Sequence, residues 1–227
     1  MLPLLGLRVG IEIELLYSLI IIICSIVIYF ITKELYELSS HQGIKYFRQA
    51  FLFFVIAYFL RSFIKVLLHY FNVVEIFDIP KHIFPHVTLF IFMYFSSMAV
   101  FYLLYSVIWK GGDENRVYLF HGLALIIAVL SAITKDITIR LIIHLFLLLV
   151  VFYIVYYSYS KEKNKSLFFI YVLLLVFWIL NIFDILIPNV LRTFQLALYV
   201  ASALIFFFIL YKVISVLGGR DGKTSKT

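Results

Sequence analysis

The sequence predicts an all-α integral membrane protein, a bundle of seven transmembrane helices. Hydrophobic residues make up 65% of the 227 residues and charged residues only 14%, and the mean hydropathy is +1.10. Soluble domains contain about 25% charged residues. Long apolar runs recur along the chain and are separated by short polar segments. Because lipid offers no hydrogen-bond partner to the backbone, we expect these runs to cross the bilayer as helices.

Seven apolar runs are long enough to span a bilayer. They cover residues 13–32, 50–70, 87–109, 117–134, 139–159, 167–187 and 193–216. The fourth run is the shortest. The longest connection on the inner side, 33–48, contains Ser39, Ser40 and Gly43, which are typical of turns, and part of it is expected to form a short helix on the membrane surface.

The distribution of Lys and Arg predicts the orientation, because cytoplasmic loops carry an excess of both residues. One side holds five of them: Arg8, Lys81, Lys135, Arg140 and Arg192. The other side holds twelve: Lys33, Lys45, Arg48, Lys110, Arg116, Lys161, Lys163, Lys165, Lys212, Arg220, Lys223 and Lys226. We therefore expect a multi-pass protein of the cell membrane with its N-terminus outside. Residues 1–217 are expected to form one transmembrane domain, and the polar residues 218–227 a flexible cytoplasmic tail.

Charge and cysteine content exclude several classes of protein. The net charge is +7, but the basic residues lie in short loops and form no continuous patch, so no nucleic-acid partner is expected. The single cysteine, Cys24, lies inside an apolar run, which excludes a disulfide framework. Glu12 and Glu14 precede the first run and no cleavage pattern follows it, so this helix is expected to be retained.

The sequence contains an internal repeat. Residues 77–108 match residues 183–214 at nine of 32 positions without gaps, where roughly three or four matches are expected for segments of such biased composition. Helices 1–3 and 5–7 are therefore expected to be a parallel duplication. Its units cover about residues 11–108 and 137–214, and the linking helix covers about 117–134.

This three-plus-one-plus-three arrangement resembles the SWEET transporters and, more loosely, the opsins and the seven-helix sensor regions of signalling proteins. The resemblance covers all seven helices and rests on arrangement alone. A likeness to SWEET transporters implies transport of a small solute, although the sequence lacks their Pro-Gln pair. An opsin is disfavoured because Lys212, the only lysine of the last helix, lies near its cytoplasmic end.

A basic stripe on the second helix is the first candidate for a functional site. Arg61, Lys65 and His69 are spaced four residues apart, which places their side chains on one helix face. Arg61 is expected about 16 Å deep in a hydrocarbon layer of ~30 Å. A charge at the bilayer centre costs at least ~2.5 kcal/mol, so such residues usually face a partner or a water-filled site. Both a ligand site and a structural ion pair remain open.

The remaining polar residues predict a vestibule that opens outward and is closed on the inner side. Ser96 and the repeat-related Ser202 are expected near its floor. Asn181 and Asp184 share a face of the sixth helix, and Asp184 is the expected partner of Arg61 or Lys65. The candidate ligand-binding residues are Arg61, Lys65, His69, Ser96, Asn181, Asp184, Gln195 and Ser202.

A divalent metal site is a second possibility. Asp78, His82 and His86 are spaced four residues apart, a geometry in which a helix can present zinc ligands, and His69 or His144 is a further candidate ligand. Pro80 and Pro85 interrupt the segment and argue against a helix there. The seven-helix zinc hydrolases of the ceramidase and adiponectin-receptor type carry paired histidines late in the chain, which the last helix lacks. No cofactor is expected, and zinc or another divalent metal is the single alternative.

The function expected from these observations is that of a receptor, sensor or assembly protein. Its basic outer vestibule would take a small ligand, with an anion as one option, and its inner loops would face a cytoplasmic protein partner. A SWEET-like small-solute transporter is the alternative, and a zinc-dependent hydrolase ranks behind it. No phosphate loop, nucleophile elbow or paired-carboxylate site is present, so an enzyme is not expected.

Overall fold

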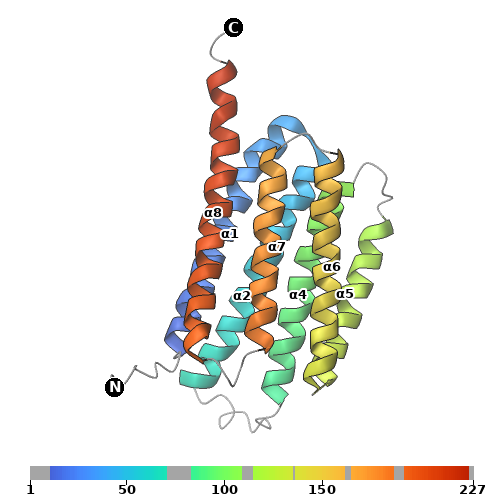
Figure 1. The fold of residues 1–227 in the computed structure, drawn as a ribbon, viewed down its shortest axis with the longest axis vertical. Coiled ribbons are helices and arrows are strands. Elements are labelled where there is room, and N and C mark those ends of the chain that lie inside the picture. Colours follow the sequence, from blue (N-terminus) through green and yellow to red (C-terminus); the bar gives the residue numbers. More distant parts are fainter. Residues whose placement is uncertain are drawn as a thin grey trace.

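The computed structural model describes residues 11–70, 83–108, 115–134, 136–161, 165–186 and 192–224. Within these ranges the chain forms seven α-helices and no strand (Figure 1). The helices are α1 (Ile11–Ser39), α2 (Gln42–Tyr70), α4 (Ile83–Ile108), α5 (Asn115–Ile133), α6 (Ile137–Lys161), α7 (Lys165–Leu186) and α8 (Arg192–Thr224). Each predicted apolar run falls on one of these helices, which confirms the all-α class.

Six of the helices pack as a closed ring. Around the ring, α1 packs against α2, α2 against α4, α4 against α6, α6 against α7, α7 against α8, and α8 against α1. The remaining helix, α5, lies at the edge of the bundle, mainly against α4 (Figure 1). The interior of the ring is therefore bounded by helices from both halves of the chain.

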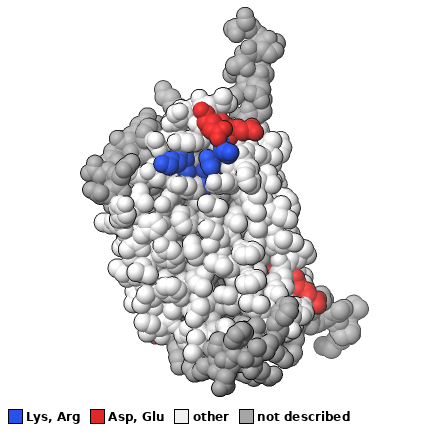
Figure 2. Space-filling model, turned by 180° about the vertical axis from the view of Figure 1, so that it is seen from behind, with Lys and Arg blue, Asp and Glu red and all other residues white. Residues whose placement is uncertain are grey.

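The outer surface of the bundle is apolar. Large hydrophobic side chains such as Leu149, Phe152 and Phe208 are more than half exposed. The face in Figure 2 shows a broad band without charged residues; Lys and Arg lie with acidic residues towards one end, and acidic residues alone are visible near the other. A soluble protein rarely exposes an apolar surface of this extent, whereas a bilayer solvates it.

Within the described ranges, four helices are long and apolar enough to cross a membrane, namely Ile11–Ser39, Gln42–Tyr70, His86–Ile108 and Phe194–Ser215. Shorter apolar helical stretches cover Val117–Ile133, Leu141–Tyr157 and Phe168–Phe183. With the apolar outer surface, these spans indicate a membrane protein.

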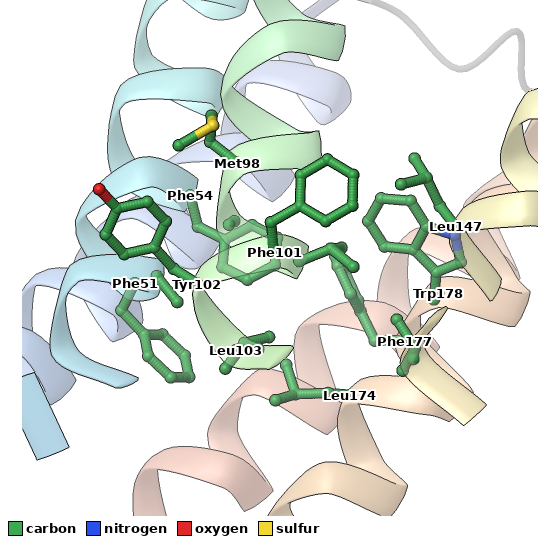
Figure 3. Packing of buried hydrophobic residues seen from close by; sticks show 14 of the residues in the cluster. Phe51, Phe54, Met98, Phe101, Tyr102, Leu103, Leu147, Leu174, Phe177 and Trp178 are labelled. Atoms are coloured by element: carbon green, nitrogen blue, oxygen red, sulfur yellow. The ribbon is translucent and has the colours of Figure 1, made fainter. Parts of the chain in front are cut away.

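An aromatic cluster of Phe51, Phe54, Phe177 and Phe206 fills the centre of the ring. The ring centroids of Phe54 lie 6.2 Å from Phe177 and 6.0 Å from Phe206, and Phe177 lies 4.7 Å from Phe206, all in edge-to-face geometry. Figure 3 shows Phe51, Phe54 and Phe177 among the side chains that pack between the helices. Edge-to-face pairs add about 0.5–1.5 kcal/mol each beyond the area they bury. The aromatic cluster thus joins α2 to α7 and α8 across the ring.

The connection between α1 and α2 is much shorter than the sequence predicts. Ser40 has a left-handed φ of 51°, and its amide donates a hydrogen bond to the carbonyl oxygen of Tyr36 at 2.7 Å. This bond ends α1 with a left-handed cap, and α2 begins at Gln42. The turn predicted at Ser39 and Ser40 is present, but 33–48 forms no separate helix, because one left-handed residue reverses the chain directly between α1 and α2.

Two other helix ends differ from the prediction in extent. The last helix, α8, continues to Thr224, beyond the predicted end of the seventh run at 216. The mobility expected of the tail stays a prediction. Pro85 does not prevent a helix, because α4 begins at Ile83 and the proline lies in its first turn, where no helical partner for its nitrogen is needed.

Candidate ligand-binding cavity

A cavity of about 450 Å³ lies inside the ring, between α2, α4, α6 and α7. Its volume is within the range of about 300–1,000 Å³ that is typical of small-molecule sites. The polar lining residues are Arg61, Lys65, Thr88, Ser96, His144 and Asn181. The aromatic and aliphatic lining residues are Phe54, Tyr58, Leu68, Leu89, Phe92, Met93, Phe177 and Trp178. A few polar groups in a largely apolar pocket are the usual composition of a ligand site.

The two cations of the cavity, Arg61 and Lys65, come from successive turns of α2 and meet one carboxylate. Arg61 Nη2 donates a hydrogen bond to Glu14 Oε1 at 2.6 Å, and Lys65 Nζ donates to the same oxygen. The side chains of Arg61 and Glu14 are 21% and 19% exposed. Glu14 belongs to α1 and is not a described lining residue of the cavity. The predicted partner, Asp184, has a side chain outside the described part of the structure.

Arg61 is held on two sides. Besides the contact with Glu14, its guanidinium carbon lies 4.8 Å from the ring centroid of Phe92 on α4. A cation over an aromatic face is stabilised by about 0.5–2 kcal/mol, depending on how far it is desolvated. The guanidinium is therefore positioned at the cavity wall by both α1 and α4.

Tyrosine hydroxyls extend the polar contacts across the ring. The hydroxyl oxygens of Tyr17 and Tyr58 lie 3.4 Å apart, and the Tyr58 hydroxyl donates to Asn181 Oδ1, also at 3.4 Å. Asn181 Nδ2 donates to the Phe177 carbonyl at 2.9 Å. Sequence analysis missed these tyrosines as site residues, because in a chain with 17 tyrosines and 25 phenylalanines they are not distinguishable from core aromatics.

Half of the eight predicted ligand residues line the cavity, namely Arg61, Lys65, Ser96 and Asn181. Two others lie on α8 instead. Gln195 Nε2 donates to the Tyr199 hydroxyl at 3.0 Å, and Ser202 is buried on the same helix, α8. The rings of Tyr17 and Tyr199 stack at 4.6 Å. His69 is exposed and lies beside Tyr70, so the structure does not bring it to the described cavity wall.

His144 and Trp178 form the wall opposite α2. Neither is among the eight predicted ligand-binding residues, and His144 was named as a further candidate metal ligand. His144 is 6% exposed, and its ring centroid lies 6.3 Å from that of Trp178 at an angle of 24°. Trp178 Nε1 donates to the carbonyl oxygen of His144 at 3.4 Å. A lone histidine within a long apolar run was the available signal for this position.

The predicted metal residues are only partly described. Asp78 and His82 lie outside the described residues, and His86 is half-buried in the second turn of α4. Among the side chains that the structure describes, no three His, Cys, Asp or Glu residues are grouped as metal ligands. A metal site at Asp78 and His82 stays a prediction.

The described residues form an all-α protein with four helices able to span a membrane and a partly polar cavity between its helices. No family model matches the chain, and no solved structure matches it, so the resemblance to SWEET transporters or opsins gains no support from these comparisons. The chain is 31% identical over 211 residues to an "Uncharacterized protein" of Archaeoglobus fulgidus, and the match covers 90% of this chain and 92% of that protein. The chain belongs to the same family as this archaeal protein.

Proposed function

We propose that the protein is a seven-span receptor or sensor of the cell membrane, with its N-terminus outside, that binds a small anion in the cavity. One observation carries the proposal. Arg61 and Lys65 both line the cavity, and no acidic side chain is among its described lining residues. Arg61 and Lys65 carry one positive charge more than the single carboxylate of Glu14 that contacts both, so the charge of these described residues favours a negatively charged ligand.

The distribution of charge supports an outward-facing cavity. The end of the bundle that carries the α1–α2 turn holds Lys33, Lys45 and Arg48, the type of residue that accumulates on the cytoplasmic side. The cavity lies towards the other end of the bundle. Its lining residues Lys65 and Leu68 belong to the last two turns of α2, and Thr88 belongs to the second turn of α4. A ligand would then enter from outside the cell.

The aromatic cluster favours ligand binding over transport of a solute through the bundle. Phe54 and Phe177 line the cavity on the side towards the α1–α2 turn. Phe51 precedes Phe54 by about one helical turn on α2 and so lies closer to that turn. The described helices are continuous through the level of the cavity, whereas transporters commonly break helices at the binding site. A cavity closed on one side by packed rings suits a receptor, which then passes its signal to a cytoplasmic partner.

The helix contacts keep a transporter as a second candidate. If helices 1–3 were duplicated as helices 5–7, α1 would correspond to α6 and α4 to α8. The contact of α1 with α8 would then be equivalent to that of α6 with α4, and both contacts are present in the ring. This equivalence supports the parallel repeat of the SWEET-like arrangement.

Ligand-dependent thermal unfolding in lipid nanodiscs tests the proposal. Inorganic anions, carboxylates, sugars, amino acids and divalent metals are compared, and we expect stabilisation by anions alone. A ligand at 100 times its Kd stabilises the fold by about 2.7 kcal/mol. Arg61→Ala should abolish the stabilisation.

Arg48→Ala is the matched control. Arg48 also lies on α2, its guanidinium donates to the Tyr29 hydroxyl at 2.9 Å and lies 4.4 Å from the centroid of that ring, but it does not line the cavity. This variant should keep the response to anions. A panel without any stabilising anion, or a response that survives in Arg61→Ala, contradicts the proposal. Solute flux in proteoliposomes would favour the transporter instead.

A further inference from the structure

We propose that the ligand is an anionic amphiphile, a molecule with one carboxylate-like or phosphate-like group and an apolar body. This inference rests on the proposed function and specifies the ligand class of the same cavity. It follows from the separation of charge and apolar surface on the cavity wall. Both cations come from α2, which also supplies Phe54, Tyr58 and Leu68. The facing wall from α4 and α7 carries no described charged residue, and Phe92, Met93, Phe177 and Trp178 outnumber its polar residues Thr88, Ser96 and Asn181.

The cationic edge suits a planar anionic group. A guanidinium presents its N–H donors in a fixed fork that matches a carboxylate or a phosphate, whereas an ammonium acts as a point charge. Arg61 is oriented by Glu14 and Phe92 before any ligand binds. Lys65 lies one turn further along the same face of α2 and lines the same cavity. An anion at Arg61 is therefore within the field of a second cation.

The apolar wall selects the rest of the molecule. An inorganic anion would leave most of a cavity of about 450 Å³ unfilled. A sugar would find hydrogen-bond partners for some of its hydroxyl groups at Thr88, Ser96 and Asn181, but each hydroxyl left unpaired against the aromatic wall costs about 1–3 kcal/mol. An apolar body gains about 0.8 kcal/mol for each methylene that it buries. Only a molecule with both parts matches both surfaces.

Binding of a homologous series of alkyl carboxylates tests the inference. Acetate, butyrate, hexanoate and octanoate are titrated into the full-length protein in phosphatidylcholine nanodiscs, and the signal of empty nanodiscs is subtracted. We expect roughly fourfold tighter binding per added methylene, which corresponds to about 0.8 kcal/mol. Octan-1-ol and octylammonium, which have the same body without the anion, should bind at least tenfold more weakly than octanoate.

Two classes of variant separate the anionic group from the body. Arg61→Ala should remove the preference for octanoate over octan-1-ol and keep the dependence on chain length. Trp178→Ala should flatten the dependence on chain length and keep the preference for the anion. Since Trp178 is 5% exposed and its loss can unfold the protein, Leu89→Ala, at a half-buried lining position, provides the same test at lower risk.

The outcomes distinguish this inference from the proposed function. Acetate that binds as tightly as octanoate would overturn the amphiphile and leave a receptor for small anions. Absence of binding for every carboxylate and inorganic anion would overturn both. Nanodiscs with added phosphatidylglycerol identify the source of the ligand. If the parent protein no longer binds octanoate in these nanodiscs, the anionic lipid occupies the cavity and the ligand is a membrane lipid. If octanoate binding is unchanged, the ligand is a soluble amphiphile.

Discussion

Glu14 is the residue on which the arrangement of charges depends. One of its oxygens accepts hydrogen bonds from both Arg61 and Lys65. A cation within an apolar span costs at least ~2.5 kcal/mol, and the carboxylate offsets part of that cost for two cations at once. Removing one partner of a buried pair is far more destabilising than the pair is stabilising, because the other charge stays buried.

The substitution Glu14→Gln should therefore lower the free energy of unfolding by about 1–3 kcal/mol. The glutamine keeps the shape of the side chain and can still accept hydrogen bonds, but it no longer neutralises Arg61 and Lys65. Denaturant-induced unfolding in detergent micelles measures the effect.

The neighbouring Glu12→Gln is the control. Glu12 is exposed, two residues earlier on the same helix, and its replacement should change stability by no more than about 0.5 kcal/mol. Equal effects of the two substitutions would show that the loss of negative charge near the start of α1, and not the contact with Arg61 and Lys65, determines stability.

The sequence predicts the cations of the site better than their partner. A spacing of four residues places Arg61 and Lys65 on one face whatever surrounds the helix. Which carboxylate they meet depends on which helices are neighbours, and that information is not local. Glu14 from α1 is the carboxylate that the described residues place against both cations, and pairing with Asp184, whose side chain is not described, stays a prediction.

At the scale of single elements, the turn after α1 departs most from the prediction. Ser40 is the one described non-glycine residue with a positive φ, at 51°. For a residue with a Cβ atom this conformation costs about 1–2 kcal/mol, and glycine avoids the cost.

Ser40→Gly should raise the free energy of unfolding by up to about 1 kcal/mol. The substitution removes the strain of the left-handed conformation, but glycine also increases the conformational entropy of the unfolded chain, which offsets part of the gain. Thermal unfolding compares it with Ser40→Ala, which keeps the Cβ atom and should give no increase. A stabilising alanine would mean that the loss of the hydroxyl, and not the backbone conformation, is responsible.

The aromatic cluster permits a second prediction for the helices. Phe206 is fully buried and Phe208, two residues later on α8, is 57% exposed. Phe206→Ala should cost about 3–5 kcal/mol because it leaves a cavity between α2, α7 and α8. Because the side chain of Phe208 does not pack into the protein core, Phe208→Ala should change stability by about 0.5 kcal/mol or less. Similar losses for both, measured by unfolding in micelles, would contradict a packed centre.

The number and positions of the helices follow from the sequence more directly than their ends do. Apolar runs of bilayer length predict seven helices, and the structure places one on each. The ends depend on capping interactions such as the bond from the Ser40 amide to the Tyr36 carbonyl, which a composition-based boundary does not detect. For this reason α1 and α2 are longer than predicted. Pro85 lies inside a helix for a different reason, namely its place in the first turn of α4.

For the whole molecule, the proposed orientation makes a prediction about accessibility. The natural Cys24 is buried, so it should not react with a membrane-impermeant maleimide in intact cells. Glu12→Cys and Glu37→Cys introduce thiols at exposed positions near opposite ends of α1. Glu12→Cys should be labelled in intact cells, and Glu37→Cys only after permeabilisation. The reverse pattern would place the cavity on the cytoplasmic side.

The cavity itself was only partly predictable. The uneven distribution of polar residues indicated a vestibule, and four of its predicted residues line the observed cavity. Of the other predicted positions, Asp184 has an undescribed side chain, and His69, Gln195 and Ser202 are not among the described lining residues because of the rotation of their helices. Periodicity shows which residues share a helix face, but it does not show whether that face turns towards the centre, a neighbour or the outside. His69 shares the face of Arg61 in sequence and is nevertheless exposed at the end of α2.

The short turn at Ser40 also bears on how the protein is made. Because two residues join α1 and α2, these helices can enter the membrane together as an antiparallel pair early in translation. Glu14 lies on the first helix of that pair, and Arg61 and Lys65 lie on the second. Inserting a lone arginine or lysine at the centre of a helix costs about 2.5–3.5 kcal/mol. The carboxylate that offsets this cost is already synthesised when the cations leave the ribosome, so insertion of the basic helix need not wait for the second half of the chain.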